Sequence, residues 1–208
     1  SSSNSENDNI AIGFDAMTTN TAGGNANVVV GNYAGDAITS GDNNASIGHT
    51  SLTGVTSGDA NSGLGQHSGA NLTTGSNNTF VGYNSQPSAV DVSNEITFGD
   101  ANVTALRSAD QSIAALSDGR DKTDVVDLPH GLDFINQTRP VRFKWDIRDG
   151  QPDKGKQGTT NYGFIAQELL EIGNNEEHRL VYESNPDKLE ARYSNLIPMM
   201  AKAIQELS

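Results

Sequence analysis

Cysteine is absent from this chain of 208 residues, which rules out disulfides and thiolate metal sites and leaves the redox compartment open. No apolar run reaches the roughly 18 to 20 residues that a membrane-spanning helix needs. Ser1 to Asn9 also lacks the charged and apolar regions of a signal peptide. We therefore expect no membrane partner, and nothing in the composition calls for a cofactor.

Basic residues are scarce in the first half of the chain. Residues 1 to 116 contain no lysine and one arginine, Arg107, against ten acidic residues, whereas residues 117 to 208 contain twelve basic and sixteen acidic residues. Neither half has the basic surface that a phosphate backbone requires, so we expect no nucleic-acid partner. Fifteen of the 22 glycines and only five of the twelve aromatics lie in the first half, which argues against one ordinary globular core.

The first half is a repeat with a period of 17 residues. Its columns contain asparagine, then an aliphatic residue directly before glycine, and then a small residue three positions later. The asparagines are Asn9, Asn27, Asn44, Asn61 and Asn78; the glycines are Gly13, Gly31, Gly48, Gly65 and Gly82. A second glycine series (Gly23, Gly41, Gly58, Gly75) follows ten residues behind the first, and a second apolar column (Ile38, Val55, Leu72) precedes threonine each time.

This period predicts a β-solenoid with one rung per repeat, each rung having two short strands and two turns. Stacked rungs place like residues over like, so we expect a hydrogen-bonded asparagine ladder and glycines at turn positions with positive φ. A rung this thin buries little apolar area, which favours a parallel homotrimer. A disordered linker is disfavoured, because low complexity alone does not keep five columns in register.

The rungs resemble the head repeats of trimeric bacterial adhesins and of phage tail fibres, in which an Asn-x-x-aliphatic-Gly pattern recurs. We assign residues 1–87 to the stalk and residues 88–116 to transition strands and a connector, with strands expected between Ala89 and Leu106. The stalk aromatics either contact a host receptor or glycan or pack between chains, and packing is favoured. These aromatics are Phe14, Tyr33, Phe80 and Tyr83.

Residues 117–208 have the pattern of a small α+β domain. The expected strands are Val141 to Trp145, a buried strand at Tyr162 to Ile165, and a pair at Leu180 to Tyr182 and Leu189 to Tyr193. The expected helices are Leu128 to Asn136, with Pro129 in its first turn, Ala166 to Ile172, and a C-terminal helix capped by Ser194 and running through Leu207. Arg148 to Thr160 is expected to protrude as a hairpin. The apolar stripe of the last helix packs on its own domain or, in a trimer, on its copies; its members are Leu196, Ile197, Met200, Ala203, Ile204 and Leu207.

The polar stretch between the halves, Leu116-Ser117-Asp118-Gly119-Arg120-Asp121-Lys122, combines a hydroxyl with an amine. Taken alone it is most simply an interdomain turn. Read as chemistry, Ser117 is a candidate nucleophile and Lys122 its candidate base. Residues five apart lie about 140° apart on an α-helix, so a turn or a neighbouring chain has to bring them together.

Four segments in order resemble the intramolecular chaperone auto-processing domain of phage tailspikes and tail fibres, the peptidase S74 family. They are SDGRDK from Ser117, RPVRFKW from Arg139, YGFIAQEL from Tyr162, and YSNLIPMMAKAIQEL from Tyr193.

The resemblance implies a domain that helps three chains trimerise and fold a β-rich fibre and then cuts itself off. Carried over, the scissile bond is Leu116–Ser117, the nucleophile is Ser117 and the general base is Lys122. Arg120 either supplies positive charge or orients the loop by pairing with Asp118 or Asp121, and the orienting role is favoured. The fibre would belong to the virion, with the chaperone domain released in the host cytoplasm.

Three alternatives remain at this stage. The first is a non-cleaving trimerisation domain of a fibre or adhesin. The second is a membrane-bound transcription factor carrying the same domain, which the missing basic patch and membrane helix disfavour. The third is a bacterial surface adhesin, for which a C-terminal anchor is expected. The histidines form no spaced set, so no metal site is expected; they are His49, His67, His130 and His178.

Overall fold

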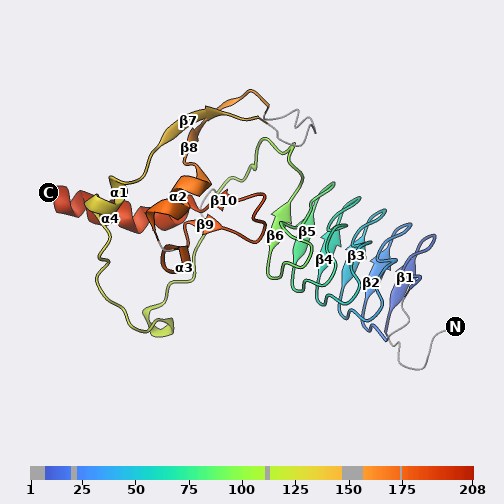
Figure 1. Ribbon diagram of the computed structural model, residues 1–208. Coiled ribbons are helices and arrows are strands. Elements are labelled where there is room, and N and C mark those ends of the chain that lie inside the picture. The colour runs from blue at the N-terminus through green and yellow to red at the C-terminus, as the bar shows by residue number, and fades with distance from the viewer. Residues whose placement is uncertain (1–7, 20–22, 111–112, 147–156, 174) are drawn as a thin grey trace. The chain divides into compact units, whose positions relative to one another are not determined.

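The computed structural model describes residues 8–19, 23–110, 113–146, 157–173 and 175–208. The chain divides into two compact units, Ser1–Val103 and Thr104–Ser208. The first contains short parallel strands, and the second combines helices with two small sheets (Figure 1). The expected break at residue 117 stays a prediction.

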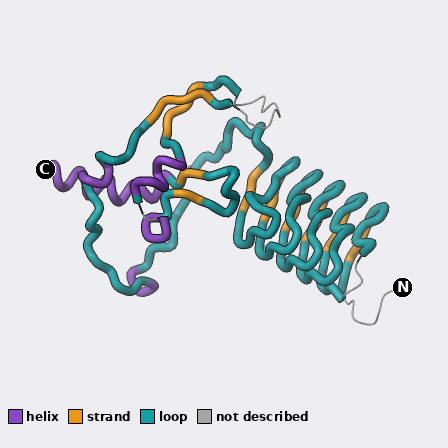
Figure 2. The backbone as a smooth tube through the Cα atoms, viewed as in Figure 1, coloured by secondary structure: helices purple, strands orange, loops and turns teal. Residues whose placement is uncertain are grey.

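The first unit is a β-solenoid, as predicted. Its six three-residue strands form one parallel sheet in chain order (Figures 1 and 2). Val28 pairs with Ala45, and Ala45 with Ser62, so from β2 onward each rung advances by one 17-residue repeat, whereas β1 pairs with β2 at a spacing of 18. The strands are β1 (Ile10–Ile12), β2 (Val28–Val30), β3 (Ala45–Ile47), β4 (Ser62–Leu64), β5 (Thr79–Val81) and β6 (Ile96–Phe98).

The prediction of two strands per rung is wrong, because in the described residues each rung contains one. The second apolar column lies in a bend, where consecutive rungs are joined mainly through the threonine that follows it. The backbone N–H of Thr39 donates to the carbonyl of Thr56 at 2.9 Å, and that of Thr56 donates to Thr73 at 2.8 Å. This contact is too short to count as a second β-strand pairing. Ile38 and Val55 are nevertheless fully buried, as expected.

The predicted asparagine ladder is confirmed. The Oδ1 of Asn44 accepts hydrogen bonds from the backbone N–H and the Nδ2 of Asn61, at 3.0 and 3.1 Å. The Nδ2 of Asn44 also donates to the carbonyl of Gly58 across the rung, at 2.8 Å. Asn27, Asn61 and Asn78 repeat the pattern, and all of these amides are buried. From Asn27 to Asn78, each rung is therefore tied to the next at a position that water does not reach.

The two glycine series serve different purposes. Gly48 has a φ of 141°, as predicted for the first series. Gly58, in the second series, is not in the left-handed region, but a Cβ there would overlap the carbonyl oxygen of Gly75 in the next rung. Gly41, Gly58 and Gly75 of the second series are thus required by close stacking of the rungs, whereas Gly23, the first member of the series, has a φ of 94°.

The sheet continues one strand beyond residue 87. Strand β6 pairs with β5 in the same register. Glu95 takes the place of the asparagine, and its backbone N–H donates to Asn78 Oδ1 at 2.9 Å. The carbonyl of Val92 accepts from Asn78 as the glycine carbonyls do in earlier rungs. The residues expected to form transition strands thus include a sixth rung.

One face of the solenoid sheet exposes apolar side chains. Middle residues of the strands, such as Val29 and Phe80, point into the core, so the aliphatic residues that precede the glycines point outward. Ile12, Leu64 and Phe98 are 60%, 53% and 60% exposed. The single chain leaves this row uncovered.

Phe80 is a core residue of its own chain, whereas the other three stalk aromatics are exposed. The rings of Phe14 and Tyr33 meet edge to face with centroids 5.4 Å apart.

The second unit has the expected α+β composition. Helix α2 (Ala166–Ile172) has the predicted bounds, and β7 (Val141–Lys144) ends one residue early. β7 pairs antiparallel with β8 (Thr160–Gly163), and β9 (Val181–Tyr182) with β10 (Glu190–Ala191). The remaining elements are the 3₁₀ turn η1 (Gly119–Asp121), α1 (Leu132–Ile135), α3 (Asn175–His178), the 3₁₀ turn η2 (Tyr193–Asn195) and α4 (Leu196–Leu207).

Three predictions in this unit need correction. Helix α1 begins only after Gly131, which has non-helical angles, so Pro129 lies outside it. The expected buried strand at 162–165 is mostly exposed and ends at Gly163, and Tyr162 is 73% exposed. Ser194 does not cap α4, because η2 leads directly into that helix. Most of the hairpin expected at Arg148 to Thr160 lies outside the described residues.

Helix α4 buries only part of the predicted stripe, together with one residue outside the stripe, Met199. Its buried residues are Leu196, Met199 and Ala203. Leu196 and Met199 belong to a core that also contains Phe134 of α1 and Leu169 of α2. The rest of the predicted stripe stays exposed: Ile197 64%, Met200 48%, Ile204 66% and Leu207 71%.

Candidate functional site

The polar stretch at the start of the second unit folds into a tight turn. Residues 119–121 form the 3₁₀ turn η1, and Asp118 caps it in an extended conformation. The Asp118 Oδ1 accepts a hydrogen bond from the Arg120 backbone N–H at 2.9 Å, as N-cap carboxylates do. Because Ser117 lies before this turn and Lys122 after it, the turn sets the separation of the two side chains.

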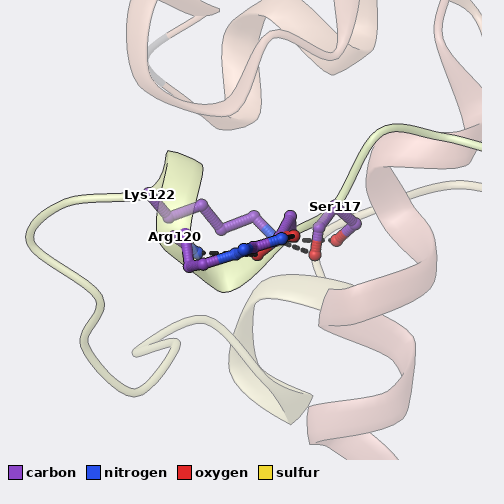
Figure 3. Close-up of polar contacts among 4 residues, drawn as sticks. Ser117, Arg120 and Lys122 are labelled. Carbon is purple, nitrogen blue, oxygen red and sulfur yellow. Dashed lines mark hydrogen bonds and ion pairs between the residues drawn. The ribbon is translucent and has the colours of Figure 1, made fainter.

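The turn brings Ser117 and Lys122 into contact within one chain. The Lys122 Nζ donates to Ser117 Oγ at 2.6 Å and to the Ser117 carbonyl oxygen at 2.9 Å. Figure 3 shows the Lys122 side chain running back along the turn to reach Ser117. The pair has the separation that a nucleophile and its base require. No partner chain is needed to bring these two atoms together, although the sequence left that alternative open.

Arg120 pairs with Asp118 on the same turn. The Arg120 Nη2 lies 2.6 Å from Asp118 Oδ2, and its Nε donates to Asp118 Oδ1 at 3.1 Å (Figure 3). Hydrogen bonding from Arg120 lowers the pKa of the Asp118 carboxyl, and hydrogen bonding to Asp118 raises the pKa of the Arg120 guanidinium. Both charges therefore persist at neutral pH, and their contact fixes the geometry of the turn.

The whole region around the turn is open to solvent. Every described residue from 104 to 127 is exposed. Leu116, at the carbonyl side of the predicted scissile bond, is fully exposed, and Val125 and Val126 beyond the turn are 76% and 81% exposed. Nothing in the described part of the unit removes water from the Ser117–Lys122 pair.

An apolar pocket of about 460 Å³ lies elsewhere in the second unit. Tyr162, Phe164 and Tyr193 line it together with Met200 of α4. No residue of the 117–122 turn contributes to it, so the pocket is not a substrate cleft for the pair.

The fold also assembles three residues that sequence reasoning did not single out. His130, Glu177 and His178 lie together, although His130 is far from the other two in the sequence. Their spacing resembles no metal motif, so only the fold reveals the group.

Residues 117–178 match the peptidase S74 family model, described as chaperone of endosialidase. The match begins at Ser117 and includes α2, but it stops before the last of the four sequence motifs. It follows the β-solenoid along the chain. No curated protein and no solved structure matches the chain significantly.

Among the described residues, no helix has the length and apolar character that crossing a membrane requires.

Proposed function

We propose, from the match of residues 117–178 to the chaperone of endosialidase, that this chain is the C-terminal part of a phage tail fibre or tailspike. The match supports an intramolecular chaperone role in tail proteins. In the proposal, the second unit drives homotrimerisation and folding of the solenoid stalk and then cuts itself off at Leu116–Ser117. The stalk stays in the virion, where it offers a surface for a host receptor or glycan, and the chaperone part is released in the host cytoplasm.

The observation that carries the cleavage proposal is the 2.6 Å contact between Lys122 Nζ and Ser117 Oγ, at the first residue of the family match. In the first step, Ser117 Oγ attacks the carbonyl carbon of Leu116 while a neutral Lys122 amine takes the hydroxyl proton. The C–N bond then breaks, the proton passes to the leaving nitrogen of Ser117, and an ester joins Leu116 to Ser117 Oγ. Water hydrolyses the ester, giving a Leu116 carboxylate and restoring the serine hydroxyl.

Burial is the condition that the single chain does not meet. A lysine acts as a base only when neutral, and removal from water is the usual means of favouring the neutral form. Because the turn and the apolar residues near it are exposed, we infer that another copy of the chain covers them. Cleavage would then follow assembly, even though the two reacting side chains come from one chain.

We infer that copies of the chain meet at the exposed apolar rows. One row follows the outer face of the solenoid sheet, and the other follows α4. Exposed apolar patches that continue along an element are typical of protein interfaces. A parallel homotrimer would bury both rows, and a C-terminal helix with such a stripe is suited to packing against its own copies.

Ser117→Ala tests the proposal directly. We expect wild type to give two bands on a denaturing gel, and Ser117→Ala and Lys122→Gln to give one band of full length, with cleavage slowed by at least about 10³-fold. Lys202→Gln, a lysine of α4 remote in sequence from the turn, is the control and should cleave normally.

A single full-length band for wild type, from a sample shown to be trimeric, would overturn self-cleavage. It would leave the non-cleaving trimerisation domain as the function.

A further inference from the structure

Two histidines and a glutamate converge in the second unit away from the 117–122 turn. One ligand atom from each of His130, Glu177 and His178 lies within 4.8 Å of the others. His130 comes from the segment just before α1, and the other two come from the end of α3. The His130 Nε2 lies 3.6 Å from the Glu177 Oε1.

Packing holds the two imidazoles in place. Both rings contact Phe134, a buried residue of α1, with centroid separations of 5.4 Å to His130 and 5.0 Å to His178. The two imidazoles meet edge to face at 4.5 Å. The backbone of Gly173 closes over His178, since a Cβ added there would lie 2.8 Å from the His178 Nδ1. Side chains held in this way lose little conformational entropy when they bind a ligand.

We propose that His130, Glu177 and His178 bind a divalent transition-metal ion, with Zn²⁺ as the best match. Two imidazole nitrogens and one carboxylate oxygen form a ligand set that zinc accepts, with water in the fourth position. Zinc bonds of about 2.0 to 2.2 Å place tetrahedral ligands roughly 3.3 to 3.5 Å apart, so the three atoms need to move together by about 1 Å. The half-buried imidazoles disfavour Ca²⁺ and Mg²⁺, which prefer an all-oxygen shell.

The ion would act as a cross-link within the second unit. It joins the segment before α1 to α3, which are separated in the chain by β7, β8 and α2. A ligand that binds only the folded state stabilises it in proportion to the logarithm of its concentration over the dissociation constant. None of the three residues belongs to the 117–122 turn, so the role proposed for the cross-link is structural.

Zn²⁺ titration of the full-length chain tests this site. All variants carry Ser117→Ala, so the outcome does not depend on self-cleavage. We expect binding of one Zn²⁺ per chain, measured by competition with a chromophoric chelator, and a rise of about 5 to 10 °C in the unfolding midpoint of the second unit at free Zn²⁺ tenfold above the dissociation constant. Mg²⁺ at the same concentration should have no such effect.

Glu177→Gln and His130→Asn should each weaken Zn²⁺ binding at least tenfold. Glu177 is largely exposed, with 61% of its side chain accessible, so its replacement should leave the fold intact, as checked by circular dichroism. The control is His49→Asn/His67→Asn, which removes two exposed histidines of the solenoid and should leave binding unchanged. The proposal is overturned if Glu177→Gln and His130→Asn bind Zn²⁺ as wild type does, or if the double control abolishes binding. The proposal is also overturned if the starting protein binds no Zn²⁺, and the cluster is then only an ion pair between His130 and Glu177 with His178 beside it.

Discussion

A single buried asparagine side chain holds three rungs of the solenoid together. Asn61 donates to Asn44 Oδ1 at 3.1 Å and to the Gly75 carbonyl at 2.9 Å, and it accepts from the backbone and side chain of Asn78 at 3.1 and 3.0 Å. It is completely buried. No other side chain of similar size offers both two donors and an oxygen acceptor at this position except glutamine, which is longer.

Asn61→Ala should destabilise the solenoid strongly. The change leaves polar groups of the neighbouring rungs buried without partners, and each such group costs about 1–3 kcal/mol. We expect a loss of about 3 kcal/mol or more, measured by denaturant unfolding in the Ser117→Ala background. Ser62→Ala, at the next and outward-facing residue, is the control and should stay within about 0.5 kcal/mol of the parent. Equal losses in the two variants would show that the ladder is not the source of stability.

Asp118→Ala should slow cleavage although Asp118 takes no part in bond exchange. It removes both the cap of η1 and the partner of Arg120, so Ser117 and Lys122 lose the turn that holds them together. Misplacement of reacting groups by about 1 Å can slow a reaction by about a hundredfold. We therefore expect the half-time of cleavage, followed on a denaturing gel, to rise by about ten- to a hundredfold. Asp118→Asn, which retains a capping oxygen, should have a smaller effect.

Gly119→Ala is the matched control for this turn. A Cβ at Gly119 meets no atom within 4 Å, and Gly119 is not in the left-handed region. It should therefore cleave at close to the wild-type rate. If Gly119→Ala were as slow as Asp118→Ala, general sensitivity of the segment would replace the specific role of the carboxylate.

At the scale of elements, α4 has two apolar faces. The inner face packs against α1, and Glu206 adds to this contact by accepting from the Leu132 backbone N–H at 2.7 Å. This bond lowers the pKa of the Glu206 carboxyl. The outer face, with Ile197, Met200 and Ile204, has no cover in the single chain. Helix and stripe were predictable from the spacing of apolar residues, but the buried face was not, because both sides of the helix are apolar.

Ile204→Asn should weaken trimerisation while leaving the second unit folded. Burying an isoleucine side chain contributes about 1.5–3 kcal/mol, so each copy should lose more than tenfold in association. Light scattering measures the oligomer, and circular dichroism checks the helix. Gln205→Asn places the same residue on the exposed, polar side of α4 and should leave the oligomer unchanged. A trimer equally stable in both variants would place the interface away from α4.

The solenoid was predicted correctly from those repeat columns in which the same residue type has the same surroundings in every rung. The asparagine column is such a case, and its period fixed the stacking. The second strand was wrong because β-prone residues such as Ile38 and Val55 also suit a buried bend, and their burial alone does not distinguish the two. The sixth rung was missed because Glu95 and Val92 replace the residues that marked the repeat. In that rung the backbone, and not the side chain, continues the contacts.

The residues of the candidate site could be named from the sequence, but their positions relative to one another could not. Ser117, Lys122, Asp118 and Arg120 were proposed from the motif, and their roles stay predictions. The need for a turn followed from helix geometry. The contact between Ser117 and Lys122 within one chain is made across the η1 turn that Asp118 caps, which the spacing alone does not show. The group of His130, Glu177 and His178 was out of reach, because it depends on how α3 packs against Phe134.

At the scale of the whole molecule, the proposed trimer would fold by one means and persist by another. While the second unit is attached, it would keep three stalks together at high effective concentration during slow, long-range β pairing. After the proposed cleavage the stalk would retain its contacts but lose this tether. Its lifetime would then be set by the barrier to unfolding and not by an equilibrium.

Refolding after full denaturation should therefore depend on cleavage. We expect the uncut Ser117→Ala trimer to recover its solenoid and its mass after denaturant is diluted, and the cut wild type to recover at least tenfold less. Circular dichroism and light scattering report the two quantities. Equal recovery would mean that the stalk needs no chaperone.

Because of the asparagine ladder, the number of repeats sets the length of the stalk. Each interior rung offers the rung above and the rung below the same hydrogen bonds, so a whole repeat can be gained or lost without creating a new kind of junction. Neighbouring strands lie about 4.8 Å apart, and the length of the fibre would change in steps of that size. Duplication of the repeat is thus a route by which the length of the stalk can change while the second unit stays the same.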